Sequence, residues 1–118
     1  MSIQLIEHSQ TAEIRIAGKF LGALHGEAFN DLFNQVKAKK LTNVVINLSN
    51  TDMIDSTGIG LFISALTSLR RENGDIRLAG MHTRIKNVFL MTRLLGPVFK
   101  NYETLDEALE SFTSAAEV

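Results

Sequence analysis

Three observations predict that this chain folds as an α/β protein with a mixed, mostly parallel sheet. Segments with the alternation of a strand precede segments with the spacing of an amphipathic helix, and the pattern reads ββαβαβαβα. The run of residues 44–48 is almost continuously apolar, which is typical of a strand covered on both faces. The first two strands are joined by a short turn, which adds one antiparallel pair. We therefore expect about five strands and about four helices.

Composition sets the broad class of the protein. The 118 residues, 45% hydrophobic and 21% charged, suit one globular domain spanning residues 1–118. The net charge of -1 argues against direct nucleic-acid binding, because such proteins normally carry a basic excess. The chain has no Cys, which excludes disulfides, thiol catalysis and zinc-thiolate sites.

Targeting signals are not visible in the sequence. The first ten residues, MSIQLIEHSQ, lack the basic region and apolar core of a signal peptide. No apolar run approaches the roughly 18 residues of a membrane helix. We expect a cytoplasmic protein that does not bind a membrane.

The N-terminal third predicts a hairpin and a helix. Ile3 and Leu5 mark the first strand, and the second strand ends at Gly18. Residues 22–40 predict an amphipathic helix. Its apolar residues recur at four-residue steps, with two phenylalanines beside them: Leu24, Ala28, Leu32 and Val36, and Phe29 and Phe33. The lysines of its last turn favour a solvated helix end over a nucleic-acid patch.

The central segment is the most informative. The strand of residues 44–48 should lead through a short polar turn into a helix that opens on Asp55-Ser56-Thr57-Gly58. This helix carries one apolar stripe and meets a C-terminal stop at residues 72–74. The stripe consists of Ile59, Phe62, Ile63, Leu66 and Leu69.

The C-terminal part predicts a strand, a helix, a strand and a last helix. The strand around Ile76 ends at Gly80, and a helix over residues 83–95 is stopped by Gly96-Pro97. That helix is apolar on more than one side, so its second stripe is either simply exposed or a docking surface. A short strand over residues 98–102 and a helix capped by Thr104 complete the chain.

Two glycines in the first turn of the central helix are unusual. Gly58 and Gly60 each cost roughly 1 kcal/mol relative to Ala in a helix interior. Glycine lets another backbone or a ligand come close. Ser56 stands at the helix N-terminus, where free N–H groups and the helix dipole favour a phosphate. The segment thus offers a serine on an approachable backbone, although Asp55 can also be read simply as a helix cap.

Catalytic interpretations find little support. No G-x-S-x-G elbow surrounds Ser56, and the three histidines lack the spacing of a zinc site. The fragment Gly58-x-Gly60 lacks the third glycine of a dinucleotide fingerprint, and no Walker lysine follows. We expect no enzyme activity, no metal and no cofactor.

The segment Met53-Ile54-Asp55-Ser56-Thr57-Gly58-Ile59-Gly60-Leu61 resembles the signature of STAS domains, the fold of bacterial anti-sigma factor antagonists. The resemblance extends over nearly the whole chain, through Gly18, residues 44–48, 76–80 and 88–102, and the tail of residues 104–109. It implies a mixed sheet with helices stacked mainly on one side.

The resemblance also implies a function. In this family the serine after the aspartate is phosphorylated by a partner that is both an anti-sigma factor and a serine kinase. By resemblance that residue is Ser56, with Thr57 as the second choice. The unphosphorylated antagonist sequesters the kinase and frees the sigma factor, and a PP2C-type phosphatase resets it. The residues expected to contact the partner are Asp55, Thr57, Gly58, Ile59, Gly60 and Leu21.

Leu21 is a departure from the family pattern. Many antagonists carry an Asp in the loop after the second strand, where the kinase docks, and Leu21 occupies that position here. A constitutive STAS module in a signalling or lipid-transport assembly, without phosphorylation, therefore stays open as the alternative. The sequence also leaves open a monomer or a weak homodimer.

Overall fold

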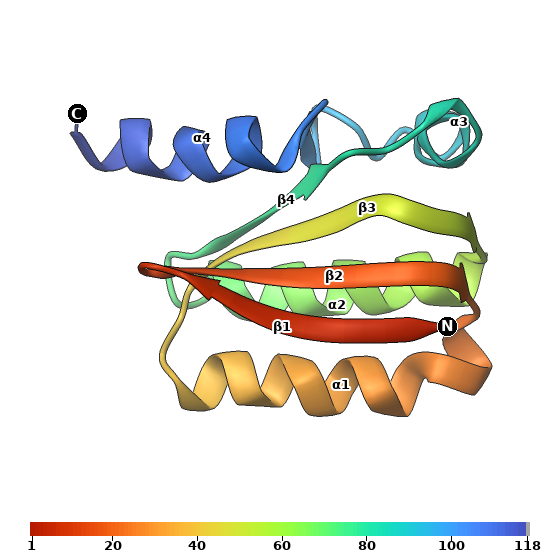
Figure 1. Cartoon of the computed structure of the whole chain (residues 1–118), viewed down its shortest axis with the longest axis horizontal. Coiled ribbons are helices and arrows are strands. Elements are labelled where there is room, and N and C mark those ends of the chain that lie inside the picture. The colour runs from red at the N-terminus through yellow and green to blue at the C-terminus, as the bar shows by residue number, and fades with distance from the viewer. Residues whose placement is uncertain (118) are drawn as a thin grey trace.

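A computed structural model describes residues 1–117, with side chains described as far as Thr113, and shows a mixed α/β fold (Figure 1). Within this part of the chain, five strands and four helices form: β1 Ser2–His8, β2 Thr11–Phe20, α1 Gly22–Ala38, β3 Asn43–Ile54, α2 Ser56–Arg70, β4 Asp75–Ala79, α3 Thr83–Met91, β5 Lys100–Tyr102 and α4 Leu105–Glu117. The sheet order is β1-β2-β3-β4-β5. The β1–β2 pair is antiparallel and the other pairs are parallel, so the predicted fold class is confirmed.

The helices cover the two faces of the sheet unequally. Val44 and Ile46 of β3 belong to a large apolar cluster that includes buried residues of α1, α2 and α3. Val45, on the opposite face of the same strand, packs in a second cluster with Ala108 and Phe112 of α4. Figure 1 shows α4 and α1 on opposite sides of the central strands. The expectation of helices mainly on one side is confirmed.

An aromatic cluster ties the end of β2 to the first two helices. Phe20, Phe29 and Phe62 are fully buried, and their ring centroids lie 5.4–5.8 Å apart. Such pairs add about 0.5–1.5 kcal/mol beyond the burial of their area. Phe20 is thereby held against α1 and α2, and the chain that follows it must turn close to the start of α2.

Two strands, β2 and β3, are longer than the sequence predicted, whereas β5 is shorter and begins at Lys100 instead of residue 98. The polar residues after Leu48 do not form a turn, because β3 continues to Ile54, and β2 continues past Gly18 to Phe20. Thr51 is fully buried and its hydroxyl donates to the backbone oxygen of Ile16 at 2.7 Å. Pairing with β2 and this internal bond satisfy a segment whose composition suggested a turn.

The buried side of α1 also differs from the predicted stripe. Leu24 is 72% exposed and Ala28 is exposed, whereas Gly22 and Gly26 are buried. A Cβ atom at Gly26 would lie 3.3 Å from Leu61 of α2. Phe29, Phe33 and Val36 are buried as predicted, so the predicted face is wrong only at Leu24 and Ala28, in the part of α1 that approaches α2 through glycines.

The third helix is shorter than expected and ends at Met91 instead of residue 95. Arg93 adopts a φ of 58°, and the Leu94 amide donates to the backbone oxygen of Phe89, which closes the helix in a turn. Leu90 and Met91, from the predicted second stripe, are 53% and 84% exposed. The expected Thr104 cap of α4 is confirmed, since its hydroxyl accepts from the Glu107 amide at 3.1 Å.

A buried carboxylate joins the first three strands on the face that α4 partly covers. Glu13 of β2 is fully buried. Its two oxygens lie 2.7 Å from His8 Nε2 of β1 and 2.7 Å from Arg15 Nε, and Asn47 Nδ2 of β3 donates at 3.0 Å. We call these four residues the Glu13 cluster. Burial alone would raise the pKa of Glu13, but hydrogen bonds from Arg15, Asn47 and His8 outweigh it and hold the pKa below its ordinary value.

The Glu13 cluster predicts a pH-dependent stability. Because the folded-state pKa is depressed, the carboxylate stabilises the fold above about pH 4.5, and this contribution is lost as the pH falls through the lower folded value. Glu13→Gln should lower the free energy of unfolding by roughly 1–3 kcal/mol at pH 7, because Arg15 loses its ionised partner. Urea titrations of both proteins at neutral and acid pH measure the difference, which should shrink at acid pH. The exposed Glu27→Gln is the control, and an equal effect from it would contradict the assignment.

A methyl group added at the packed Gly22 and one added at the open Gly60 should change the free energy of unfolding in opposite directions. A Cβ at Gly22 would lie 2.5 Å from the amide nitrogen of Gly58, so the backbone must shift, whereas nothing lies within 4 Å of a Cβ at Gly60. Gly22→Ala should therefore lower the free energy of unfolding by about 1–3 kcal/mol. Gly60→Ala should raise it by about 0.5–1 kcal/mol, as expected for a helix interior. Urea denaturation decides, and a loss in both variants would show that Gly60 is also packed.

Candidate functional site

The candidate site lies where β2 and β3 end and α1 and α2 begin. Asp55 follows β3 directly and is the N-cap of α2, with extended φ and ψ of -97° and 174°. Its Oδ1 atom accepts hydrogen bonds from the Gly58 amide at 2.7 Å and from the Gly22 amide at 2.9 Å. One carboxylate oxygen therefore caps α2 and also binds the first residue of α1.

The backbone amides around Asp55 stabilise the ionised form of its carboxyl group. The amide of Gly22 and then that of Gly58 hold the pKa of Asp55 below its ordinary value, and the nearby His25 adds a smaller effect in the same direction. Asp55 is thus ionised at neutral pH. An ionised acceptor makes a stronger hydrogen bond to a backbone amide than a neutral one.

Ser56 and Thr57 are the exposed hydroxyl residues of this site. Both lie in the first turn of α2. Within the part of the chain that the structure describes, the Ser56 hydroxyl makes no hydrogen bond to the protein. The methyl carbon of Thr57 packs against the start of α1. The contact is so close that a Cβ added at Gly22 would lie 2.6 Å from this carbon. Of the two, Ser56 is the less engaged.

The other predicted partner residues divide into exposed and buried positions. Gly60 is exposed, with open space above it, so a partner can approach its backbone closely. Gly58 and Ile59 are buried. A Cβ at Gly58 would lie 2.9 Å from the ring of Phe20, so the absence of a side chain there serves the internal packing. Because they are buried, Gly58 and Ile59 cannot make extensive contacts with a partner and can only support the exposed residues around them.

Leu21 is brought to the same place by the turn between β2 and α1. We call residues 20–22 the Leu21 turn. Leu21 is half-buried and is the N-cap of α1, but no side chain caps the helix from that position. Its amide donates to Nδ1 of His25 at 3.0 Å, and the imidazole ring stacks near Phe20 at 6.3 Å between centroids.

Sequence reasoning missed Gly22 and His25 as members of the site. One signal was available: α1 begins without Ser, Thr, Asp or Asn at its N-cap, although its first amides need acceptors. An uncapped start predicts that the acceptors come from elsewhere in the chain. Here Asp55 and His25 provide them.

The histidines do not form a metal site. His8 belongs to the Glu13 cluster, His25 binds the Leu21 turn, and Nε2 of His82 lies 2.7 Å from the backbone oxygen of Thr51. Among the described residues, no three His, Asp or Glu side chains gather as metal ligands would. No helix in residues 1–117 is both long enough and apolar enough to span a membrane.

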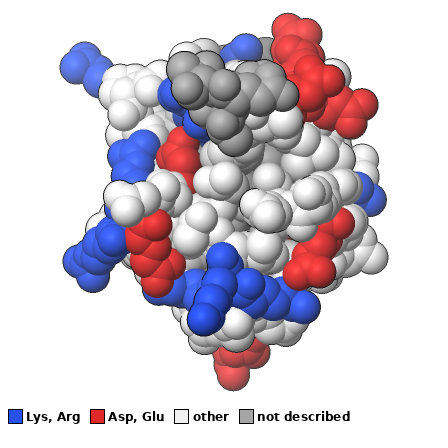
Figure 2. Space-filling model, turned by 90° about the vertical axis from the view of Figure 1, so that its left-hand side faces the viewer, with Lys and Arg blue, Asp and Glu red and all other residues white. Residues whose placement is uncertain are grey.

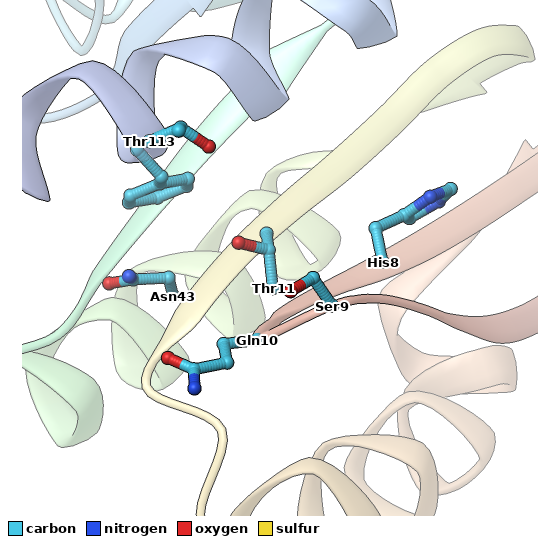
Figure 3. Close-up of a pocket in the computed structure, with 7 residues that line it drawn as sticks. His8, Ser9, Gln10, Thr11, Asn43 and Thr113 are labelled. Carbon is cyan, nitrogen blue, oxygen red and sulfur yellow. The ribbon is translucent and has the colours of Figure 1, made fainter.

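A pocket of about 230 Å³ lies away from the candidate site. It sits at the β1–β2 turn beside the start of β3 (Figure 3). Ser56, in contrast, follows the end of β3. Its described lining is mostly polar and consists of His8, Ser9, Gln10, Thr11, Asn43, Phe112 and Thr113. Ser56 does not line this pocket but is exposed at the start of α2, which suits contact with a macromolecule.

The end of the molecule that carries the β1–β2 turn has no uniform charge. Figure 2 shows Lys and Arg along the lower and left margins, with Asp and Glu among them around an uncharged centre. Lys39 and Lys40 are exposed, and Lys39 forms an ion pair with Glu7 at 3.5 Å, as expected for a solvated helix end. Lys37, in the last turn of α1, differs because it is half-buried and donates to the Ser68 hydroxyl of α2.

Comparison with known proteins identifies the family. The STAS domain family model matches residues 2–108. An anti-sigma-B factor antagonist of Staphylococcus epidermidis is 27% identical over 94 residues, which cover 80% of this chain and 86% of that protein. A counterpart from Staphylococcus aureus, with the same description, is 23% identical over the same length.

Solved structures share the fold at lower identity. An anti-sigma factor antagonist from Mycobacterium paratuberculosis superposes with a TM-score of 0.82 at 21% identity, covering 93% of this chain and 92% of that one. The Bacillus cell fate determinant SpoIIAA in its phosphorylated form gives a TM-score of 0.72 at 22% identity, covering 94% and 99%. With this fold, and with a family match over residues 2–108, the chain belongs to the STAS domain family.

Proposed function

We propose that this protein is an anti-sigma factor antagonist whose binding to its partner is controlled by phosphorylation of Ser56. The observation that carries the proposal is the position of Ser56: exposed, first in α2, and directly after the capping Asp55. A kinase can reach this hydroxyl without unfolding any element. The exposed backbone at Gly60, one turn further along α2, leaves room for a partner to approach closely.

The names of similar proteins support this proposal. The Staphylococcus relatives are anti-sigma-B factor antagonists, and one of the structural neighbours was solved in a phosphorylated form. By analogy, the partner is an anti-sigma factor that also acts as a serine kinase. A PP2C-type phosphatase would remove the phosphate, and the chain itself would act without catalysis.

A phosphate at Ser56 is sufficient as a switch on physical grounds. It would add about -1.5 to -2 charges beside the ionised Asp55. A charge enclosed in an interface without a counter-charge costs several kcal/mol, whereas a tenfold loss of affinity needs only about 1.4 kcal/mol. The free amides at the start of α2 would keep the phosphorylated monomer stable. The switch therefore needs no rearrangement of the sheet. Thr57 is the second candidate for the modified residue.

One observation favours a different role, that of a constitutive STAS module. The Leu21 turn offers an apolar side chain where many family members present an Asp, and the Leu21 amide is already bonded to His25. A module of this kind would bind its partner whatever the state of Ser56.

The proposal predicts a phosphate on Ser56 in the protein isolated from its own cells. Phosphopeptide mass spectrometry under several growth and stress conditions tests this directly. A fully covered but unmodified Ser56 peptide under all conditions would favour the constitutive module. A phosphate on Thr57 alone would move the switch by one residue.

Substitutions at Ser56 should separate binding from its regulation. Ser56→Ala, which cannot be phosphorylated, should retain the partner that the unmodified protein captures from lysate of its own cells. Ser56→Asp should retain at least about tenfold less of it. Quantitative pull-down with matched baits measures the ratio. Ser64→Asp, which places the same charge on an exposed position further along α2, is the control. Equal capture by the alanine and aspartate variants of Ser56 would contradict the switch.

A further inference from the structure

The Leu21 turn depends on the residue that precedes Ser56. Two hydrogen bonds join them: the Asp55 amide donates to the backbone oxygen of Phe20 at 3.4 Å, and the Gly22 amide donates to Asp55 Oδ1 at 2.9 Å. The second bond is the stronger, because it is shorter and its acceptor is ionised. The start of α1 is therefore held by a side chain that lies 33 positions away in the sequence.

The hydrogen bonds of Leu21 itself lie within the turn and α1. The Leu21 amide donates to His25, and the Leu21 backbone oxygen accepts from the amides of Leu24 and His25. Leu21 adds no side-chain cap. Loss of the Asp55 bond would leave the Gly22 amide, the first of α1, without its acceptor.

A phosphate on Ser56 would act on that same carboxylate. The phosphate and Asp55 are adjacent in the chain and both are anionic, so they repel each other. They also compete for the amides at the start of α2, one of which, that of Gly58, now binds Asp55 Oδ1 at 2.7 Å. Repulsion by the phosphate would turn the whole carboxylate away from the start of α2, and its bond to Gly22 would lengthen with this movement, because both amides donate to the same oxygen atom.

We propose that phosphorylation of Ser56 releases the Gly22 amide from Asp55 and so alters the Leu21 turn. This inference rests on the proposed function and adds how the site is regulated. Asp55 is then a positioning residue that holds the turn in the unphosphorylated form. The partner surface consists of two parts, the start of α2 and the Leu21 turn. The phosphate changes both: the first by its charge and the second through Asp55.

The test uses the full chain and requires no kinase. Phosphoserine is incorporated at position 56 during expression, and amide hydrogen exchange of Gly22 is followed by ¹H–¹⁵N NMR. The Gly22 amide should exchange about tenfold faster than in the unmodified protein, which corresponds to about 1.4 kcal/mol. Its ¹H shift should also move away from the position typical of a carboxylate-bonded amide. Amides in the centre of β3 should keep their protection.

Two controls make the result specific to Asp55. Phosphoserine at Ser64, an exposed position further along α2, should leave Gly22 unchanged. In the Asp55→Ala background, which removes the acceptor, Gly22 should already exchange fast, and phosphoserine at position 56 should add little. Unchanged exchange of Gly22 with phosphoserine 56, or equal acceleration by phosphoserine 64, would overturn the inference.

The outcome can be told apart from failure of the proposed function. If Ser56 is never phosphorylated in cells, the proposed function fails, whatever Gly22 does in this experiment. If the cellular protein carries the phosphate but Gly22 keeps its protection, the coupling is wrong and the phosphate acts only at its own position.

Discussion

One oxygen atom of Asp55 organises the candidate site of this protein. It receives the amides of Gly22 and Gly58, so the starts of two helices meet on a single negative charge. The two helix starts can approach each other this closely only because both donors are glycines. A Cβ on Gly22 would clash with the Gly58 backbone, and a Cβ on Gly58 would clash with the Phe20 ring. The acidic cap, the two glycines and the aromatic ring form one interdependent unit.

The rest of the fold supplies what this unit needs. The extension of β3 to Ile54 carries Asp55 to the end of β2, and the aromatic cluster around Phe20 holds α1 beside α2. The polar residues of β3 that pair with β2 are therefore part of the construction of the site. Ser56 is held at the surface by the end of β3, which precedes it, and by α2, which begins with it.

The sequence predicted the order of the elements, because periodicity and helix caps are local signals that tertiary contacts here reinforce. Val44 and Ile46 indicated the buried strand, and Thr104 indicated the start of α4. The segment from Asp55 to Gly60 indicated the site through its unusual glycines. Family resemblance then supplied the interpretation of Ser56, which composition alone would have left as a tolerated first-turn residue.

The parts that were not predicted depend on contacts between distant residues. Thr51 looked like a turn residue, and only its bond to Ile16 in the neighbouring strand explains why it is buried. Leu24 looked like a core residue, and only the close approach of Gly22 and Gly26 to α2 explains why it is exposed. The double role of Asp55 is of the same kind, since nothing near Gly22 in the sequence identifies the acceptor of its amide.

The Glu13 cluster gives the molecule a further property. It ties β1, β2 and β3 together near their hairpin end, while Ser56 follows the far end of β3, several strand residues away at about 3.3 Å each. The Glu13 cluster and the candidate site are thus separate in space. Substitutions at Leu21 or His25 therefore leave every bond of the Glu13 cluster in place, so the surface at the start of the two helices can change while the tie between the first three strands stays the same.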